Sequence, residues 1–349
     1  MVYQVRGVTL PEREERTFWI EGDRLSTRPV NGADLVIDGG WLVPGLVDVH
    51  THPGTEKPGD VFDDAVYRRH LIEHRDAGVL LIRTPGTAAR IPDRLRDDPD
   101  LPRVMSAGPW LATPGRFFPG YGRDISEEQL AAAAVEEAKA SSGWCKVIGD
   151  WTPDVPAVPL DLLRSVTQAV HAEGGRVAVH CQTAEGSRNA VLAGVDSLEH
   201  GMHLDPALLD EMATQGTVLV PTLSVLLPQI ERLRSMPRGL RRDWKLAGCL
   251  AMTSLVRAAH EASVTVLAGT DTLPFGQVSG EVEWLIRSGL PAEVALGTAS
   301  WTAREWLGLP GLVDGAPADL VAYPADPAKD PAVLCHPSRV ILRGRVIEC

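Results

Sequence analysis

The chain has 349 residues, 44% hydrophobic and 23% charged, which is typical of a soluble globular protein with room for one large barrel and a small appendage. Its formal net charge of −12 argues against nucleic acid and anionic membranes as partners. The five cysteines are scattered and form no CxxC pair, so we expect reduced thiols in a cytoplasmic protein. No signal peptide is recognisable, and no window approaches the roughly 18 apolar residues of a membrane span.

Both ends of the chain predict short β-strands with alternating apolar residues. Neither end carries enough apolar residues to fold alone, so we expect residues 1–44 and 312–349 to combine into one small β-sandwich domain. The predicted strands are Val2–Val8, Thr17–Ile20, Asp34–Ile37, Leu320–Tyr323, Arg339–Leu342 and Val346–Ile347.

Between residues 45 and 311, short apolar segments alternate with segments of helical periodicity. This order implies parallel strands joined by crossover helices, and eight such units favour a closed (β/α)8 TIM barrel, an α/β fold, over an open sheet. The helical segments include Glu127–Ala140, Leu160–Glu173 and Pro206–Gln215. The predicted strands are Leu46–His50, Val79–Arg83, Arg103–Gly108, Cys145–Ile148, Val177–His180, Ser197–His200, Thr217–Pro221 and Thr265–Gly269.

The first barrel strand ends in two histidines separated by one residue, His50-Thr51-His52. Side chains alternate along a strand, so both imidazoles project from the same side of the backbone. Such a pair suits a metal ion better than a hydrophobic core.

Further polar residues occur at the ends of the later predicted strands. In a barrel, the carboxyl ends of the strands meet at one rim, where active sites lie. Together, these residues predict a metal centre at that rim. They are His50 and His52 from the first strand, Lys146 from the fourth, His180 from the fifth, His200 from the sixth and Asp271 after the eighth.

Four segments carry a resemblance to one known family: Val43–His52, Ser197–Gly201, Gly269–Asp271 and Gly315–Val321. The first resembles the HxH signature of the metal-dependent amidohydrolase superfamily, and the last resembles the return of that family's chain into its small β-domain. The resemblance spans almost the whole chain. It is strongest to the branch of imidazolonepropionase-like enzymes and metal-dependent prolidases and related dipeptidases.

The resemblance implies a role for each rim residue. His50 and His52 would bind the more buried of two metals, and Asp271 would complete that site and serve as acid/base. His180 and His200 would bind the second metal. Lys146 would be carbamylated by carbon dioxide and bridge both metals.

The chemistry of these side chains is compatible with that assignment. A lysine ammonium has no lone pair, whereas a carbamate is an oxygen-donor anion. Imidazoles with oxygen donors suit two zinc ions, with manganese or cobalt as alternatives, and the absence of rim cysteines disfavours a structural zinc site. Two ions sharing a hydroxide would lower its pKa and polarise a carbonyl, and Asp271 could pass the proton to the leaving nitrogen.

Lys146 has an alternative role, since a lysine at a strand end can reach solvent or pair with an acid such as Asp150. The site would then hold a single metal through His50, His52, His180 and Asp271.

The loop Trp110–Arg123 is rich in glycine, proline and aromatic residues, and it places Tyr121 among the predicted pocket residues. Arg83 or Arg116 could hold a substrate carboxylate through a bidentate contact, or serve as a structural ion-pair partner. His203 could polarise a substrate group or cap a helix. The remaining histidines are expected at the surface: His70, His74, His171, His260 and His336.

The predicted function is metal-dependent hydrolysis of an amide-type C–N bond in a dipeptide, an N-acyl amino acid or a cyclic amide. Deaminases of this superfamily carry HxxE after the fifth strand, but here Glu185 lies two positions beyond the expected place after His180. A mononuclear deaminase, a lactonase or esterase, and a non-catalytic scaffold are the alternatives. The expected partner is a small-molecule substrate, and the sequence leaves a homo-oligomer open.

Overall fold

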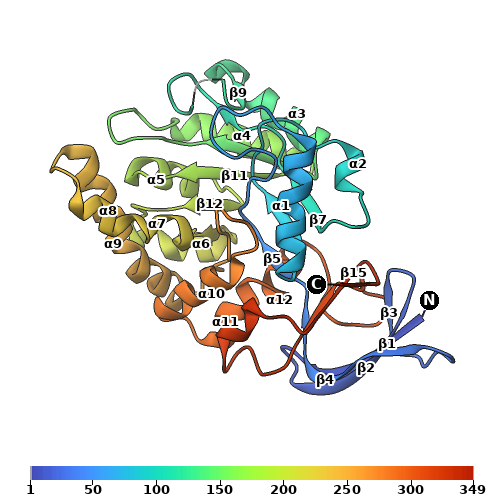
Figure 1. Ribbon diagram of the computed structural model, residues 1–349. Coiled ribbons are helices and arrows are strands. Elements are labelled where there is room, and N and C mark those ends of the chain that lie inside the picture. The colour runs from blue at the N-terminus through green and yellow to red at the C-terminus, as the bar shows by residue number, and fades with distance from the viewer. Residues whose placement is uncertain (1, 119, 349) are drawn as a thin grey trace.

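The computed structural model describes residues 2–118 and 120–348 of the chain. Within them, seven strands from both ends of the chain form one sheet of order β16-β15-β14-β4-β1-β2-β3, which lies at one end of the molecule (Figure 1). Strand β14 pairs antiparallel with β4, from Leu320 opposite Pro44 to Tyr323 opposite Trp41. The strands are β1 (Val2–Thr9), β2 (Glu14–Glu21), β3 (Arg24–Ser26), β4 (Asp34–Pro44), β14 (Leu320–Tyr323), β15 (Arg339–Leu342) and β16 (Arg345–Ile347).

This sheet has its own apolar core, which combines residues from both ends, including Val5, Phe18, Leu42, Leu320 and Ile341. Strands from the two ends of the chain are therefore paired in one sheet. The strands form a single sheet rather than two facing sheets in the described residues, so the sandwich stays a prediction.

The middle of the chain contains parallel strands in two sheets, one of order β5-β6-β7 and one of order β13-β12-β11-β10-β8-β9. The fold is therefore mixed α/β. The first seven predicted strands are all present. The strands are β5 (Leu46–Asp48), β6 (Val79–Thr84), β7 (Arg103–Ser106), β8 (Leu111–Ala112), β9 (Arg123–Asp124), β10 (Trp144–Ile148), β11 (Arg176–Cys181), β12 (Ser197–His200) and β13 (Val218–Val220).

The predicted eighth strand, Thr265–Gly269, is not a regular strand in the structure; it makes one bridge, between Val266 and Leu219. The Leu219 amide donates to the Thr265 carbonyl at 2.9 Å, and the Val49 amide donates to the Ala268 carbonyl at 3.0 Å. The segment thus lies between β13 and the residues that follow β5. Its pairing is irregular because the Ala268 amide donates to Thr298, at the end of a helix, at 3.1 Å.

Helices surround the parallel strands (Figure 1). The three helical segments predicted from periodicity correspond to η1 and α3, to α4, and to η2 and α6. The helices are α1 (Asp64–Asp76), α2 (Asp93–Arg96), η1 (Glu127–Gln129), α3 (Leu130–Ala140), α4 (Leu160–Ala172), α5 (Ala184–Leu192), η2 (Pro206–Leu208), α6 (Leu209–Gln215), α7 (Leu223–Leu226), α8 (Gln229–Ser235), α9 (Leu240–Glu261), α10 (Val278–Arg287), α11 (Ala292–Thr298), α12 (Trp301–Trp306) and η3 (Pro331–Cys335).

Most residues of the parallel strands are buried, because helices and neighbouring strands cover both faces; β9 at the edge of its sheet is not. All residues of β6, β10 and β12 are buried. Three of those residues are charged: Arg83, Lys146 and Glu199. Buried charges need partners or a purpose, and all three lie at or beneath the site described next.

Candidate metal centre

Three residues of the candidate site have left-handed backbone. His200, Thr222 and Asp271 have φ of 68°, 49° and 49°, and they are half of the six described non-glycine residues with positive φ. This conformation costs of order 1 kcal/mol for a residue with a Cβ. Such strain is common where a side chain must be held in a particular direction. Here it orients the predicted ligands His200 and Asp271, and Thr222, which is hydrogen-bonded to His200.

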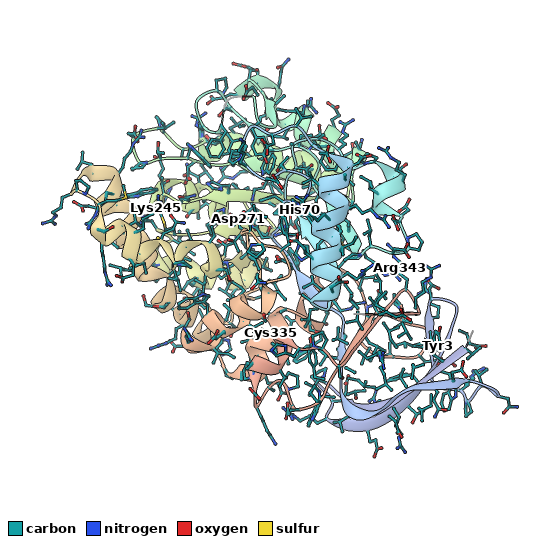
Figure 2. The ribbon with its side chains drawn as sticks, in the orientation of Figure 1. Tyr3, His70, Lys245, Asp271, Cys335 and Arg343 are labelled. Atoms are coloured by element: carbon teal, nitrogen blue, oxygen red, sulfur yellow. The ribbon has the colours of Figure 1, made fainter. Side chains whose placement is uncertain are left out.

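The predicted rim residues His50, His52 and Asp271 come together. One ligand atom from each lies within 4.8 Å of the others. The Nε2 atoms of the two histidines are 3.1 Å apart, and Asp271 Oδ1 lies 3.3 Å from His52 Nε2 and 3.8 Å from His50 Nε2. Figure 2 labels Asp271 near the middle of the molecule.

Hydrogen bonds on the far side of each ring determine which nitrogen carries the proton. His50 Nδ1 lies 2.6 Å from a Glu199 carboxylate oxygen, and His52 Nδ1 lies 2.7 Å from the Gly86 carbonyl oxygen. Both partners only accept, so each Nδ1 donates and each neutral ring presents a lone pair at Nε2. Two lone pairs and a carboxylate oxygen therefore face one another. A cation between these three acceptors is more favourable than any placement of protons on them.

His200 is oriented in the same way. The Thr222 hydroxyl donates to the Pro221 carbonyl at 2.8 Å, so it accepts from His200 Nδ1, also at 2.8 Å. This leaves the lone pair on His200 Nε2, which lies 4.0 Å from Asp271 Oδ2.

His180 adjoins His200, with 4.6 Å between ring centroids. Its Nε2 lies 3.2 Å from the side-chain amide nitrogen of Gln182, which donates to it. In a neutral ring this hydrogen bond places the proton of His180 on Nδ1, so ligation through Nδ1 requires the other tautomer, in which Nε2 donates to the Gln182 amide oxygen. The histidines from the ends of β5, β11 and β12 are therefore grouped as predicted.

Lys146 lies in the wall of the same cavity with only 1% of its surface exposed. Its Nζ is buried and has no hydrogen-bond partner in the part of the chain that the structure describes. Burial lowers its pKa to about 8, although Glu199 and Asp271 oppose the shift. Asp150, the alternative partner of Lys146, instead accepts hydrogen bonds from the backbone amide of Gln182 and from the backbone amide and hydroxyl of Thr183.

The protonation states favour metal binding. Burial lowers the pKa of His50 to about 4 and those of His180 and His200 well below the usual value. Burial raises the pKa of Asp271, but His50 and His52 lower it more, to about 2. Neutral imidazoles and an ionised carboxylate are the forms that coordinate a cation.

Arg83, predicted as a substrate contact, is completely buried and lies beneath the site. Its guanidinium donates to Glu199 at 2.7 Å, to the Ser197 hydroxyl at 3.0 Å and to the Val49 carbonyl at 2.8 Å. With its donors engaged there and its side chain outside the cavity wall, Arg83 supports Glu199, which holds His50. Arg83 is thus a structural ion-pair partner, which was the alternative to a substrate contact.

A cavity of about 460 Å³ opens above the histidines. It is large enough for a dipeptide-sized ligand. Tyr121 lines it, as predicted, and its hydroxyl lies 2.7 Å from that of Thr55. The other aromatic residues that line it are Trp110, Phe117, Phe118, Trp151 and Phe275.

Two further predicted substrate residues lie outside the cavity wall. Arg116 donates to the Pro156 carbonyl at 2.8 Å and pairs with Glu127 at 3.2 Å. His203 stacks on Trp244 and donates to its carbonyl oxygen at 3.2 Å. Both residues have structural partners.

Several residues of the site were not predicted from the sequence. Glu199, the partner of His50, was visible only as a charge inside an apolar strand. Gln182 and Lys245 line the cavity and are hydrogen-bonded to each other at 2.8 Å. Lys245 comes from the second turn of α9, where nothing in the sequence distinguishes it from a surface lysine.

The chain belongs to the amidohydrolase family, whose model matches residues 41–347. It is 42% identical over 356 residues to an uncharacterized protein of Mycobacterium tuberculosis, covering 98% of this chain and 94% of that one. It is 29% identical over 248 residues to an ochratoxinase of Aspergillus niger, covering 68% and 50%. A solved structure of a putative prolidase from Bifidobacterium longum superposes with a TM-score of 0.86 at 25% identity, covering 100% and 95%.

The predicted family is therefore confirmed, and the chain is a hydrolase. The mixed α/β fold matches amidohydrolase structures of the TIM-barrel superfamily. Members of this family generally use divalent metals, in accord with the His50, His52 and Asp271 group. None of the described helices is both long and apolar enough to cross a membrane.

Proposed function

We propose that this protein is a metal-dependent hydrolase that cleaves the amide-type C–N bond of a small molecule such as a dipeptide, an N-acyl amino acid or a cyclic amide. The observation that carries the proposal is the convergence of His50 Nε2, His52 Nε2 and Asp271 Oδ1, three acceptors with no hydrogen to share. A neighbouring cavity large enough for a substrate supports it.

The residues present fit two divalent ions, zinc with manganese or cobalt as alternatives. His50, His52 and Asp271 would hold the first ion, and His180 and His200 the second. Lys146 would bridge them as a carbamate, which would give its unpartnered, buried Nζ a purpose. A free ammonium at this place would repel both ions.

When bound, the ions supply an activated water nucleophile and polarise the scissile carbonyl. Asp271 then acts as the base and the acid: Oδ2, the oxygen turned away from the histidine pair, takes the proton of the attacking water and delivers it to the leaving nitrogen. Glu199, Gly86 and Thr222 hold three imidazoles in the ligating tautomer. The aromatic wall excludes bulk water from the reacting bond.

The deaminase alternative is weakened by the residue three positions after His180. That residue is Thr183, whose hydroxyl donates to Asp150 at 2.7 Å and accepts from the Gly186 amide at 3.0 Å, at the start of α5. Glu185 is exposed and is not part of the cavity wall. A carboxylate that could deliver protons to a heterocycle is thus missing from this position. Esterase or lactonase activity needs the same residues and remains the second candidate.

We also propose that the parallel strands form one closed barrel, supported by the hydrogen bonds of residues 265–268 to both Leu219 and Val49. Residues 1–44 and 312–349 would be its composite β-domain. The protein would act on a small molecule in the cytoplasm.

The test is a hydrolysis screen of the zinc-, manganese- or cobalt-loaded protein. It should include N-acyl amino acids, dipeptides and cyclic amides, and an ester and a lactone of matched shape. We expect amide cleavage that is lost on chelation and restored by metal. Turnover of the ester or lactone without any amide would replace the proposal by the second candidate, and release of ammonia from a heterocycle would favour the deaminase.

A further inference from the structure

Lys245 is a cavity-lining cation without a use in the hydrolysis proposed above. It lies on α9, and its ammonium donates to Gln182 Oε1 at 2.8 Å. No carboxylate among the described residues forms an ion pair with it. By contrast, Arg241, one turn earlier on the same helix, is exposed and pairs with Asp154. An ammonium has three donors, so two of those of Lys245 remain for a ligand.

The single contact with Gln182 does not explain a positive charge at this place. A neutral donor would hold the Gln182 oxygen equally well. Removing a lysine ammonium from water without an acidic partner is unfavourable, and such a group is stabilised by an anion that binds beside it. Figure 2 labels Lys245 and Asp271, which line the same cavity.

Gln182 connects Lys245 to the metal centre. Its oxygen accepts from Lys245, and its amide nitrogen donates to His180 Nε2 at 3.2 Å. An anion on Lys245 would therefore lie one glutamine side chain away from His180, close to where the scissile bond must be.

An aromatic wall adjoins His180 in the same cavity. Trp151 lies 5.1 Å from the His180 ring, and the rings of Phe117 and Phe118 lie 5.1 and 4.9 Å from Trp151. This wall favours an apolar or aromatic group. Lys57 is a second cation of the cavity wall, but it is exposed, so water screens its charge.

We infer that Lys245 binds the carboxylate of the substrate, so that the substrates are amides with a free carboxylate and an apolar group, such as N-acyl amino acids and dipeptides, rather than neutral or cyclic amides. This inference rests on the proposed function and narrows its substrate class. It transfers to Lys245 the role that the sequence suggested for Arg83 or Arg116.

The test is calorimetric binding to the metal-loaded, full-length protein. The probes are hydrocinnamate, a carboxylate with no amide to cleave, and hydrocinnamyl alcohol, its neutral analogue. We expect the wild type to bind the acid about tenfold or more tightly than the alcohol, as for a charge-assisted hydrogen bond. Lys245→Gln should remove this preference and Lys245→Arg should retain it, while Arg241→Gln, the control on the same helix, should behave as wild type.

Three results would overturn the inference. The first is an unchanged preference in a folded Lys245→Gln variant, which would indicate that the acid binds the metals directly. The second is a preference lost in Lys57→Gln but kept in Lys245→Gln. The third is equal binding, or no binding, of both probes by the wild type.

A hydrolysis assay distinguishes failure of the Lys245 anchor from failure of the proposed hydrolytic activity. N-acetyl-L-phenylalanine and N-acetylphenethylamine contain the same amide with and without the carboxylate. A preference for the acid probe that depends on Lys245 supports the anchor even if neither amide is cleaved, and the proposed hydrolysis then fails alone. Cleavage of both amides at equal rates in wild type and Lys245→Gln overturns the anchor and leaves the hydrolysis standing.

Discussion

Replacing Glu199 by glutamine should weaken both the fold and the metal centre. The Glu199 side chain is completely buried and accepts from Arg83 at 2.7 Å, from Ser197 at 2.5 Å and from His50 at 2.6 Å. The substitution leaves the buried Arg83 guanidinium without its counter-charge. Breaking a buried ion pair on one side costs about 3–5 kcal/mol. Because the amide retains hydrogen bonds, we expect the lower end, about 3 kcal/mol of unfolding free energy.

The same substitution changes the metal centre through His50. A glutamine holds the His50 ring less firmly and no longer raises its basicity, and changes of this kind reduce metal affinity about 10–100-fold. Guanidinium unfolding of the metal-free protein measures the first effect. Competition with a chromophoric chelator measures the second.

The pH dependence gives Glu199 a distinct signature. Burial raises its pKa, but Arg83, Lys146 and His50 outweigh burial and hold that pKa well below the usual value. The ionised Glu199 carboxylate therefore stabilises the folded state at pH values above its unfolded-state pKa of about 4.3. This stabilisation is lost as the pH falls through the lower pKa that Glu199 has in the folded state. The difference in unfolding free energy between wild type and Glu199→Gln should therefore become smaller at acidic pH.

Glu281 supplies the matched control, because it is equally buried but forms no ion pair with an arginine of the described residues. It accepts from the Leu223 and Ser224 amides at 2.8 and 2.7 Å. Glu281→Gln should leave metal affinity unchanged. If Glu199→Gln binds metal as tightly as wild type, or if both variants weaken metal binding equally, Glu199 does not support metal binding through His50.

Three other predictions follow from the same geometry. Asp271→Asn should lower kcat about 10²–10⁴-fold, measured with metal content determined on the same preparation, and full activity at full occupancy would exclude Asp271 as acid/base. Burial raises the pKa of Glu281 to about 7, so the folded protein keeps a proton there that the unfolded chain loses above roughly pH 4.5. The free energy of unfolding should therefore fall by about 3 kcal/mol as the pH rises from roughly 4.5 to 7, and Glu281→Gln should lack this decline. Trp151→Ala should raise KM for aromatic amides about tenfold, whereas Arg116→Gln, outside the cavity, should change KM by less than about twofold.

The ligand residues could be predicted from sequence because strand geometry is local. Alternation along a strand places His50 and His52 on one side, and parallel strands bring His180 and His200 to the same edge. Lys146 and Asp271 were also predicted from the ends of their strands, and the family resemblance then suggested a role for each. The regular strand before the histidines was predicted too long, since β5 ends at Asp48, which accepts from the His50 and Thr270 amides.

The substrate residues were harder to predict because their partners are distant in sequence. Arg83 looked available for a carboxylate, but its partner Glu199 lies 116 residues away. Lys245 and Gln182 are separated by 63 residues. His70 and His74 were expected at the surface and are buried. The α1 face that carries them packs against Phe275, a contact that no local pattern announces.

The metal content of purified, metal-reconstituted protein, measured by elemental mass spectrometry for wild type and Lys146→Ala, tests the proposed metal centre most directly. We expect about two divalent ions per chain in wild type and one or none in the variant. One ion in both proteins would remove Lys146 from the site and leave a mononuclear enzyme. No ion in the folded wild type would show that these residues do not form a metal centre.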